Sequence, residues 1–283
     1  MENRFFEDLK DKVCVITGGG GVLGSSIARG LASAGVVTVI LDINVQAASE
    51  LAEELRSEFG VRSLGLEADV LNKNSLEQVR SRIIDQVGEV DLLINGAGGN
   101  SPQATTVLEQ ITEEDLNRLD DGFFGLEMEG FRKVFDLNFT GTLLPTMVFT
   151  RRMVTRQQGV VLNVSSMNSY RPLTKIPAYS AAKASINNFT QWLAVHFARV
   201  GVRVNAIAPG FFLTSQNRFL LVDEKTEKLT PRGEKIIAST PMGVFGEPDD
   251  LNGTVLYLLS DLSRFITGIC IPVDGGYSAY GGV

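Results

Sequence analysis

Short β-branched runs alternate with longer segments of helical periodicity along the whole chain. This alternation is typical of repeated β-α-β units, in which helices join parallel strands. Strands are predicted at residues 13–16, 36–41, 61–66, 90–94, 160–164, 202–207 and 269–273. Helices are predicted at residues 23–34, 46–59, 74–87, 131–156, 178–200 and 249–259. Because the strands are almost continuously apolar, we expect helices on both faces of a doubly wound, seven-stranded parallel sheet. Residues 1–283 are therefore predicted to form a single-domain α/β Rossmann fold.

Two stretches interrupt the regular alternation. Residues 98–130 contain the unusual sequence DDGFFGLEMEG, and residues 211–248 are rich in charge. Long irregular connections in a compact domain are usually functional loops or disordered insertions. We expect residues 211–248 to form a substrate-binding lid. Residues 98–130 are predicted to be an irregular insertion, and the sequence leaves the role of its segment 120–130 open.

Charge and composition exclude several classes of protein. The formal net charge is −7 and no basic block offsets it, which argues against a nucleic-acid partner. No run of about 18 apolar residues predicts a membrane-spanning helix, and the first residues lack a secretory signal, so a cytoplasmic location is expected. The two cysteines lie in apolar runs and the chain has one histidine. We therefore expect packed, reduced thiols and no metal site.

The first predicted strand runs into TGGGGVLG at residues 17–24, and helical spacing follows. Glycines allow the backbone to turn sharply and to approach a pyrophosphate, whose charge is attracted by the N–H groups at the start of the next helix. A tight turn without a ligand is the alternative, because a glycine-rich turn alone is weak evidence. The residues expected to contact a dinucleotide here are Gly18, Gly20, Gly21, Val22, Leu23 and Gly24.

Asp42 ends the second predicted strand, about twenty residues beyond the glycines. A carboxylate there can accept hydrogen bonds from both adenosine ribose hydroxyls and repels a 2′-phosphate, so NAD is expected rather than NADP. A solvated aspartate at a strand end is the alternative. Asp69 follows the third strand and is expected at the adenine edge. The fourth strand ends in NGAG, and these residues are also expected in the cofactor site: Asn95, Gly96, Ala97 and Gly98.

Tyr179 and Lys183 lie four residues apart in YSAAK, at the start of a predicted helix and on one of its faces. A phenol with a pKa near 10 is a poor base at neutral pH, but an adjacent ammonium favours the phenolate and lowers its pKa. Tyr179 is therefore predicted to be a general acid and base. The same spacing also occurs where a tyrosine and a lysine merely cover a helix face, so the surrounding motifs must decide.

These motifs, taken in order, resemble the short-chain dehydrogenase/reductase family over essentially the whole chain. The resemblance rests on TGGGGVLG, Asp42, NGAG, Asn138 in FDLNFTG, NVSS ending at Ser166, YSAAK, NAIAPGFFLT at 205–214 and the late VDGG. It implies an oxidoreductase that uses a nicotinamide cofactor. The family pattern has a glycine where this chain has Val22, so we expect a slightly different glycine cradle with binding intact.

The resemblance also implies roles for individual residues. Tyr179 exchanges a proton with a carbonyl or alcohol, Lys183 holds the nicotinamide ribose, and Ser166 hydrogen-bonds the substrate oxygen. Asn138 fixes a water that connects Lys183 to solvent, although an asparagine inside a helix can instead satisfy backbone groups. The neighbouring Ser165 is expected to be structural. Further cofactor contacts are expected from Val70, Tyr179, Lys183, Pro209, Gly210, Phe212 and Thr214.

Five segments resemble the D-mannonate oxidoreductase, or fructuronate reductase, branch of this family: TGGGGVLG (17–24), SQNRFLL (215–221), LTPRGEKI (229–236), TPMGVFGEP (240–248) and DGGYSAYGGV (274–283). This implies interconversion of D-fructuronate and D-mannonate. A sugar acid needs a fixed cation, and Arg218 or Arg232 could hold its carboxylate. The alternating charges around them also fit a solvated helix with internal salt bridges. The other substrate contacts expected are Ser166, Asn168, Arg171 and Tyr179.

Two other functions are compatible with parts of the sequence. One is a dehydrogenase of another sugar, a polyol or a keto-gluconate. The other is a regulator that senses a nucleotide without catalysis, which would have no need for the serine, tyrosine and lysine together. By resemblance, the helices at 131–156 and 178–200 pack between subunits of a homotetramer. Trp192 and His196, on the second helix, are expected at that interface or in the core rather than in the chemistry.

Overall fold

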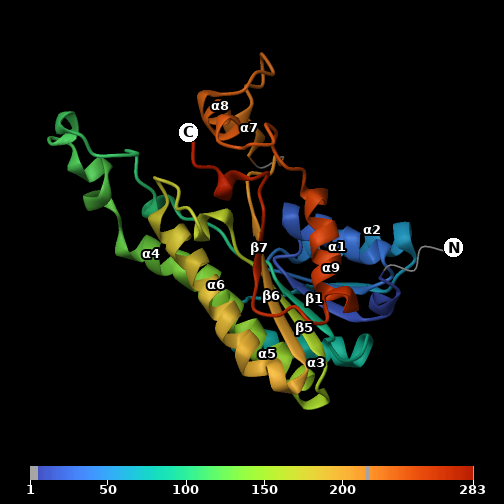
Figure 1. The fold of residues 1–283 in the computed structure, drawn as a ribbon. Helices are drawn as coiled ribbons and strands as arrows, with labels where there is room; N and C mark the ends of the chain where they lie inside the picture. The colour runs from blue at the N-terminus through green and yellow to red at the C-terminus, as the bar shows by residue number, and fades with distance from the viewer. Residues whose placement is uncertain (1–5, 215–216, 283) are drawn as a thin grey trace.

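A computed structural model describes residues 6–214 and 217–282. Within these residues, seven parallel strands form one sheet in the order β3-β2-β1-β4-β5-β6-β7 (Figure 1). The strands are β1 (Val13–Thr17), β2 (Val37–Asp42), β3 (Ser63–Glu67), β4 (Leu92–Asn95), β5 (Gly159–Val164), β6 (Val202–Pro209) and β7 (Cys270–Val273). The chain runs outward from β1 in one direction and then from β4 in the other. This reversal confirms the predicted doubly wound sheet.

Helices cover both faces of the sheet. They are α1 (Val22–Ser33), α2 (Val45–Phe59), α3 (Lys73–Gln86), α4 (Met128–Phe135), α5 (Gly141–Arg156), α6 (Pro177–Phe197) and α9 (Asn252–Leu259). Successive strand residues point to opposite faces, so Ile16 packs in the cluster with α1, α2 and α9, while Val15 packs in the cluster with α3, α5 and α6. Each face therefore has its own apolar core.

The predicted helix at 131–156 is confirmed as one continuous helical stretch, although the structure starts it at Met128 and interrupts its α-helical repeat once. Between α4 and α5 the chain makes a wide π turn at Asp136–Thr140. This turn carries the buried Asn138, whose Nδ2 donates to the carbonyls of Val134 (2.8 Å) and Gly99 (2.7 Å). π turns are often found at functional sites because they redirect a side chain. Hydrophobic periodicity did not reveal the turn, since both flanking helices keep their apolar faces.

The segment 211–248 contains two short helices, α7 (Arg218–Leu221) and α8 (Pro231–Ala238). They enclose a small apolar cluster of Leu221, Val222 and Ile236, with partly buried neighbours that include Phe211. The alternative of one solvated, salt-bridged helix is therefore wrong, because apolar burial bends the segment back on itself. Ser215 and Gln216, which begin SQNRFLL, lie outside the described residues.

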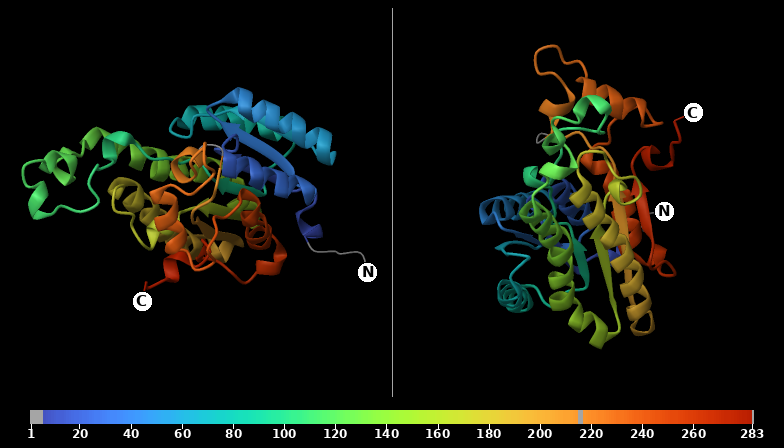
Figure 2. Two further views of the ribbon diagram at one scale, coloured as in Figure 1. Left: turned by 90° about the horizontal axis from the view of Figure 1, so that it is seen from above. Right: turned by 90° about the vertical axis from the view of Figure 1, so that its left-hand side faces the viewer.

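Residues 106–127, called the arm below, project away from the sheet (Figures 1 and 2). The arm contains short 3-10 turns at Glu113–Asp115, Leu119–Asp121 and Phe123–Gly125. At its base, the Thr106 N–H donates to the carbonyl of Lys175 (2.9 Å). The arm therefore starts beside the loop that leads to Tyr179.

The structure also bears on the excluded classes. Among the described residues, none of the helices combines the length and apolarity needed to span a membrane, and His, Cys, Asp and Glu side chains do not gather into a candidate metal site. Cys14 and Cys270 are both free thiols. Burial raises the pKa of the Cys14 thiol well above its usual range, so this side chain is a neutral core group.

Candidate active site

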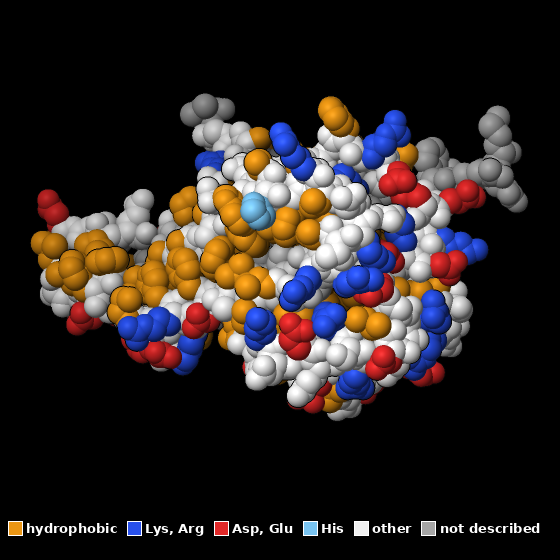
Figure 3. Space-filling model, turned by 90° about the horizontal axis from the view of Figure 1, so that it is seen from below, with side chains coloured by type: hydrophobic (Ala, Val, Ile, Leu, Met, Phe, Trp, Pro, Cys, Tyr) orange, Lys and Arg blue, Asp and Glu red, His pale blue; other side chains and the backbone are white. Residues whose placement is uncertain are grey.

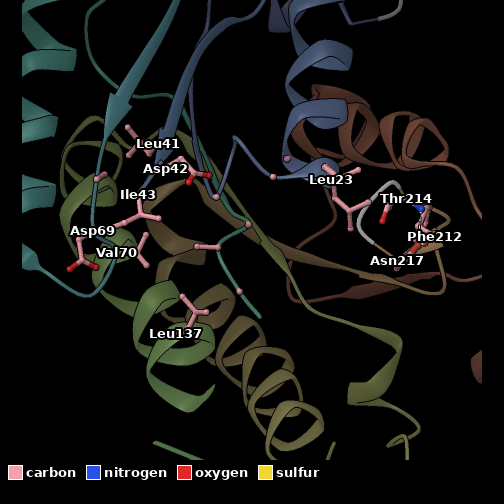
Figure 4. A pocket seen from close by; sticks show the side chains of 18 of the residues that line it. Leu23, Leu41, Asp42, Ile43, Asp69, Val70, Leu137, Phe212, Thr214 and Asn217 are labelled. Atoms are coloured by element: carbon pink, nitrogen blue, oxygen red, sulfur yellow. Dashed lines mark hydrogen bonds between the residues drawn. The ribbon is translucent and has the colours of Figure 1, made fainter. Parts of the chain in front are cut away.

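A cleft of about 680 Å³ opens at the carboxyl ends of β1, β2 and β4, where the strand order reverses (Figure 4). Ligands of open α/β sheets bind at this place, and the volume suits a large organic cofactor. Most residues that the sequence assigned to a cofactor line it: Gly18, Gly21, Val22, Leu23, Gly24, Asp42, Asp69, Val70, Gly96, Ala97, Gly98, Gly210, Phe212 and Thr214.

The glycine turn at the start of α1 is shaped for close backbone approach. Gly18 has a φ of +65°, and a Cβ on it would lie 2.8 Å from the Cα of Ala97. A Cβ on Gly24 would collide with the carbonyl oxygen of Gly18. The first turn of α1 contains no acidic residue, so nothing there neutralises the positive end of the helix dipole. Val22 lines the cleft and leaves it open, and the turn fits a pyrophosphate.

The carboxylate of Asp42 is fixed at the wall of this cleft (Figure 4). Its Oδ2 accepts a hydrogen bond from the N–H of Gly20 and its Oδ1 one from the N–H of Asn44, each at 3.0 Å. Gly20 therefore holds Asp42 in place rather than lining the cleft itself. The carboxylate keeps further lone pairs that can accept hydroxyl groups, and it places negative charge where a 2′-phosphate would lie.

Five predicted cofactor residues do not line the cleft: Gly20, Asn95, Tyr179, Lys183 and Pro209. Asn95 is buried, and its Nδ2 donates to Thr146 Oγ1 (2.9 Å) and Asn163 Oδ1 (2.8 Å) within the core. Residues that the sequence reasoning missed are Leu41, Ile43, Ala68, Leu71, Leu137, Phe211 and Asn217. Ile43 carried a usable signal, because an apolar residue directly after a strand-end aspartate has no place in the core. The other six could not be recognised from the sequence, because their place at the cleft depends on how the chain folds.

Gly98 joins the cleft to a pair of buried polar side chains. A Cβ at Gly98 would lie 2.7 Å from Asn138 Oδ1 and 3.0 Å from Lys183 Nζ. Lys183 is buried in α6, and its Nζ donates to the carbonyl of Val164 at 2.8 Å. The same Nζ lies 5.7 Å from the centre of the Tyr179 ring. The structure thus brings Asn138, Tyr179 and Lys183 together at the edge of the cleft, as the motifs predict.

Burial controls how these groups ionise in the structure. It lowers the pKa of Lys183 to about 8, because the ammonium loses its hydration. It raises the pKa of the Tyr179 phenol, and a hydrogen bond with Ser166 only partly opposes this. The expectation that the adjacent ammonium brings the pKa of Tyr179 below its usual value is therefore wrong, because burial outweighs it. The ammonium instead bonds a backbone carbonyl, and Tyr179 stays a neutral proton donor.

Asn187 connects the turn that carries Ser166 to the helix that carries Tyr179, and sequence reasoning missed it. Its Oδ1 accepts from Ser165 Oγ (2.6 Å) and its Nδ2 donates to Ser169 Oγ (2.8 Å). Ser169 Oγ in turn donates to the carbonyl of Ser166 (2.6 Å). The signal was its place two turns beyond Tyr179 on α6. Ser165 is a structural link here, as expected.

The residues expected to contact the substrate do not all lie together at the cleft. Asn168 is buried beside Ser166, and its N–H donates to Ser166 Oγ at 3.2 Å. Among the described residues, Asn168 Oδ1 has no hydrogen-bond partner. Arg171 holds the C-terminal segment, because its Nη1 donates to the carbonyls of Tyr277 and Tyr280. Two further arginines are exposed on the lid helices and do not line the cleft: Arg218 and Arg232.

Trp192 and His196 stack on the outer surface of α6, with ring centres 4.8 Å apart. The indole is 57% exposed, so the expectation of a core position is wrong for this residue. A place between subunits remains a prediction.

Comparisons with known proteins agree with this geometry. A family model described as enoyl-(acyl carrier protein) reductase matches residues 21–278. The oxidoreductase UxuB of Bacillus subtilis, whose reaction is uncharacterised, is 49% identical over 278 residues, which cover 98% of each chain. A 2-dehydro-3-deoxy-D-gluconate 5-dehydrogenase of Formosa agariphila is 31% identical over 272 residues, covering 96% of this chain and 94% of that one.

A solved structure has the same fold with a cofactor in place. It is a Haemophilus influenza protein with bound NAD, provisionally described as a D-mannonate oxidoreductase. Its TM-score is 0.92 at 47% identity, and the match covers 98% of this chain and 99% of that one. These similarities agree with the reversed parallel sheet, the glycine-lined cleft and the tyrosine and lysine grouped beside it. The chain therefore belongs to the short-chain dehydrogenase/reductase family of NAD-dependent oxidoreductases.

Proposed function

We propose that the protein interconverts D-fructuronate and D-mannonate, with NAD preferred to NADP. The main support for a hydride-transfer reaction is the contact at Gly98, where the cleft lies next to the buried Lys183 and its neighbour Tyr179. The substrate is supported by the resemblance of the lid and C-terminal segments to this branch of the family. The provisional description of the Haemophilus protein agrees with it.

The residues of the cleft fit a dinucleotide. The glycine turn would hold the pyrophosphate, and the Asp42 carboxylate would accept the adenosine ribose hydroxyls. Lys183 would hold the nicotinamide ribose beside Gly98. Bound NAD supplies and accepts the hydride, while the protein contributes placement and electrostatics.

The chain's own residues then move the proton. The Ser166 hydroxyl donates to the carbonyl oxygen of the substrate and orients it. As that oxygen gains negative charge, the neutral Tyr179 phenol gives it a proton, which completes the alcohol. Lys183, with a pKa of about 8, returns a proton to Tyr179 at near-neutral pH, and the neighbouring Asn138 would fix a water that connects Lys183 to solvent. Alcohol oxidation moves the same protons in the opposite direction.

The carboxylate of a sugar acid needs a cation, and the described residues that line the cleft include neither lysine nor arginine. Arg218 and Arg232 of the lid are our candidates, and holding the carboxylate requires the lid to close. Phe211 favours this link, because it lines the cleft and packs on the apolar cluster of the lid. A second candidate function is reduction of another keto sugar acid. The 31% identity with the Formosa 5-dehydrogenase favours it.

The outer face of α6 supports assembly into a homotetramer. Besides the buried Lys183 and the single His196, this helix of 21 residues has no ionisable side chain other than Tyr179. Its exposed positions include Trp192 and Val195, which is 79% exposed. Exposed apolar faces of this kind are typical of subunit contacts. A cytoplasmic location is part of the same proposal.

Replacing Tyr179→Phe removes the proton donor but keeps the ring. Turnover of D-fructuronate with NADH should fall about 100- to 10,000-fold, because general acid catalysis contributes this much. The dissociation constant for NADH, measured by fluorescence titration, should stay within about twofold of the wild-type value. Comparable turnover in the variant would refute the assignment of Tyr179.

The position of Asp42 predicts cofactor choice. The wild-type kcat/KM should be at least about 100-fold higher for NADH than for NADPH, since the carboxylate repels the 2′-phosphate. Asp42→Ala should narrow this ratio by raising the NADPH value. Equal values for both cofactors in the wild-type enzyme would contradict the prediction.

Asn187→Ala tests whether this residue positions Ser166 against Tyr179. We expect kcat to fall roughly tenfold, in line with one or two lost hydrogen bonds, while the NADH dissociation constant and the melting temperature stay close to the wild-type values. The neighbouring Asn188 is exposed, so Asn188→Ala is the matched control and should leave kcat unchanged. Unchanged kcat in Asn187→Ala, or an equal loss of NADH binding, would rule out a positioning role.

A further inference from the structure

The arm exposes several large apolar side chains to solvent. Val107 and Leu116 are 65% and 64% exposed, and Phe123 and Phe124 are 68% and 64% exposed. Figure 3 shows hydrophobic side chains gathered in a band along the part of the molecule that projects from the sheet. Monomeric proteins seldom present a contiguous apolar row of this length, and such rows usually mark a surface that another molecule covers.

The arm also carries most of the net charge of the protein. Residues 106–127 include seven acidic side chains and one basic one, Arg118, so their formal charge is −6 out of −7 for the whole chain. The rest of the chain is therefore nearly neutral. A surface that combines exposed aromatics with this charge fits a partner that is apolar and locally basic.

Internal contacts give the arm a defined shape although it has little core of its own. The N–H groups of Val107 and Leu108 both donate to the carbonyl of Asp121 (2.8 and 3.1 Å). Arg118 forms an ion pair with Asp115 at 2.7 Å. A side chain at Gly125 would collide with the carbonyl of Asp120. The apolar row is thus held outward in a fixed arrangement, as a docking surface requires.

We propose that the arm clasps a second copy of this chain. Figure 3 shows that the apolar band of the arm continues toward the surface of α6 around His196, on the same side of the molecule. A contact between identical subunits about a twofold axis must be self-complementary. Continuity of the arm with the uncharged face of α6 supplies one contact surface that two copies can share.

Charge complementarity supports the same occupant. Arg151, near the end of α5, and Arg199, just after α6, are exposed and form no ion pair with the described residues. In a twofold pair centred on α6, the arm of each subunit reaches toward this end of the other subunit. The acidic arm would then meet uncompensated guanidinium groups. The homotetramer proposed above was argued from the outer face of α6 alone, and the arm adds a separate contact to it.

The clasp would bear on the active site from two directions. The base of the arm is bonded to Lys175, on the loop before Tyr179, and Glu109 of the arm pairs with Lys235 of α8 at 3.2 Å. A partner that fixes the arm therefore restrains both the catalytic loop and the lid. This consequence rests on the proposed function, whereas the clasp itself does not.

The double variant Phe123→Ser/Phe124→Ser tests the clasp. Both side chains are exposed, so the variant should fold, and its melting temperature and circular dichroism check this. Sedimentation velocity at micromolar concentrations should show that the variant forms smaller species than the wild type, with a dissociation constant raised at least about tenfold. Phe265→Ser is the matched control, because Phe265 is fully exposed and distant in sequence from the arm, and it should assemble like the wild type.

A second readout comes from Trp192, the single tryptophan of the chain. Its emission should shift to longer wavelength in the arm variant at the same protein concentration, because α6 becomes more exposed. A monomeric wild type, unchanged assembly of the arm variant, or equal dissociation of Phe265→Ser would each overturn the proposal. None of these measurements uses turnover, so failure of the proposed reaction and failure of the clasp are distinguishable.

Discussion

The close contact of Gly98 with Asn138 and Lys183 is the constraint on which the rest of the site depends. It allows two buried polar groups to approach the cleft through a residue that has no side chain. Three segments meet there: the loop after β4 supplies the glycine, the π turn between α4 and α5 carries Asn138, and α6 carries Lys183. The π turn adds one residue to the helical repeat and so redirects the side chains beside it, and Asn138 lies within this turn.

Burial at this contact determines the chemistry. Lys183 loses hydration and its pKa falls to about 8, while the pKa of the Tyr179 phenol rises. A neutral phenol beside a lysine that titrates near physiological pH is matched to donating a proton to a carbonyl and being reprotonated afterwards. The raised pKa of Tyr179 therefore fits the reduction of a carbonyl group. It contradicts the expectation that the nearby ammonium lowers the pKa of the phenol. The network through Asn187 shows that the Ser166 turn is fixed to the helix that carries Tyr179, so the two groups proposed to meet the substrate share one support.

The sequence predicted the sheet, its helices and the grouping of Asn138, Tyr179 and Lys183, because these depend on local periodicity and on motifs with fixed spacing. Asp42 and Gly98 could be assigned for the same reason, since each follows directly from the end of a strand. Asn187 and the π turn could not be predicted, because they depend on which side chains meet after the chain has folded. Asn95 illustrates the opposite error: its motif predicted a cofactor contact, but its amide is used inside the core. In the sequence, the arm was recognisable only as an interruption of the alternating strands and helices. That its aromatic side chains are exposed became clear only from the folded structure.

Transfer of deuterium tests the central claim most directly, because it follows the hydride itself. Reduction of D-fructuronate by the protein with NADH deuterated at the transferring C4 position should yield D-mannonate that carries one deuterium on the former carbonyl carbon, as measured by mass spectrometry and NMR. Formation of unlabelled D-mannonate, or the absence of labelled product from D-fructuronate and from related keto sugar acids, would contradict the account.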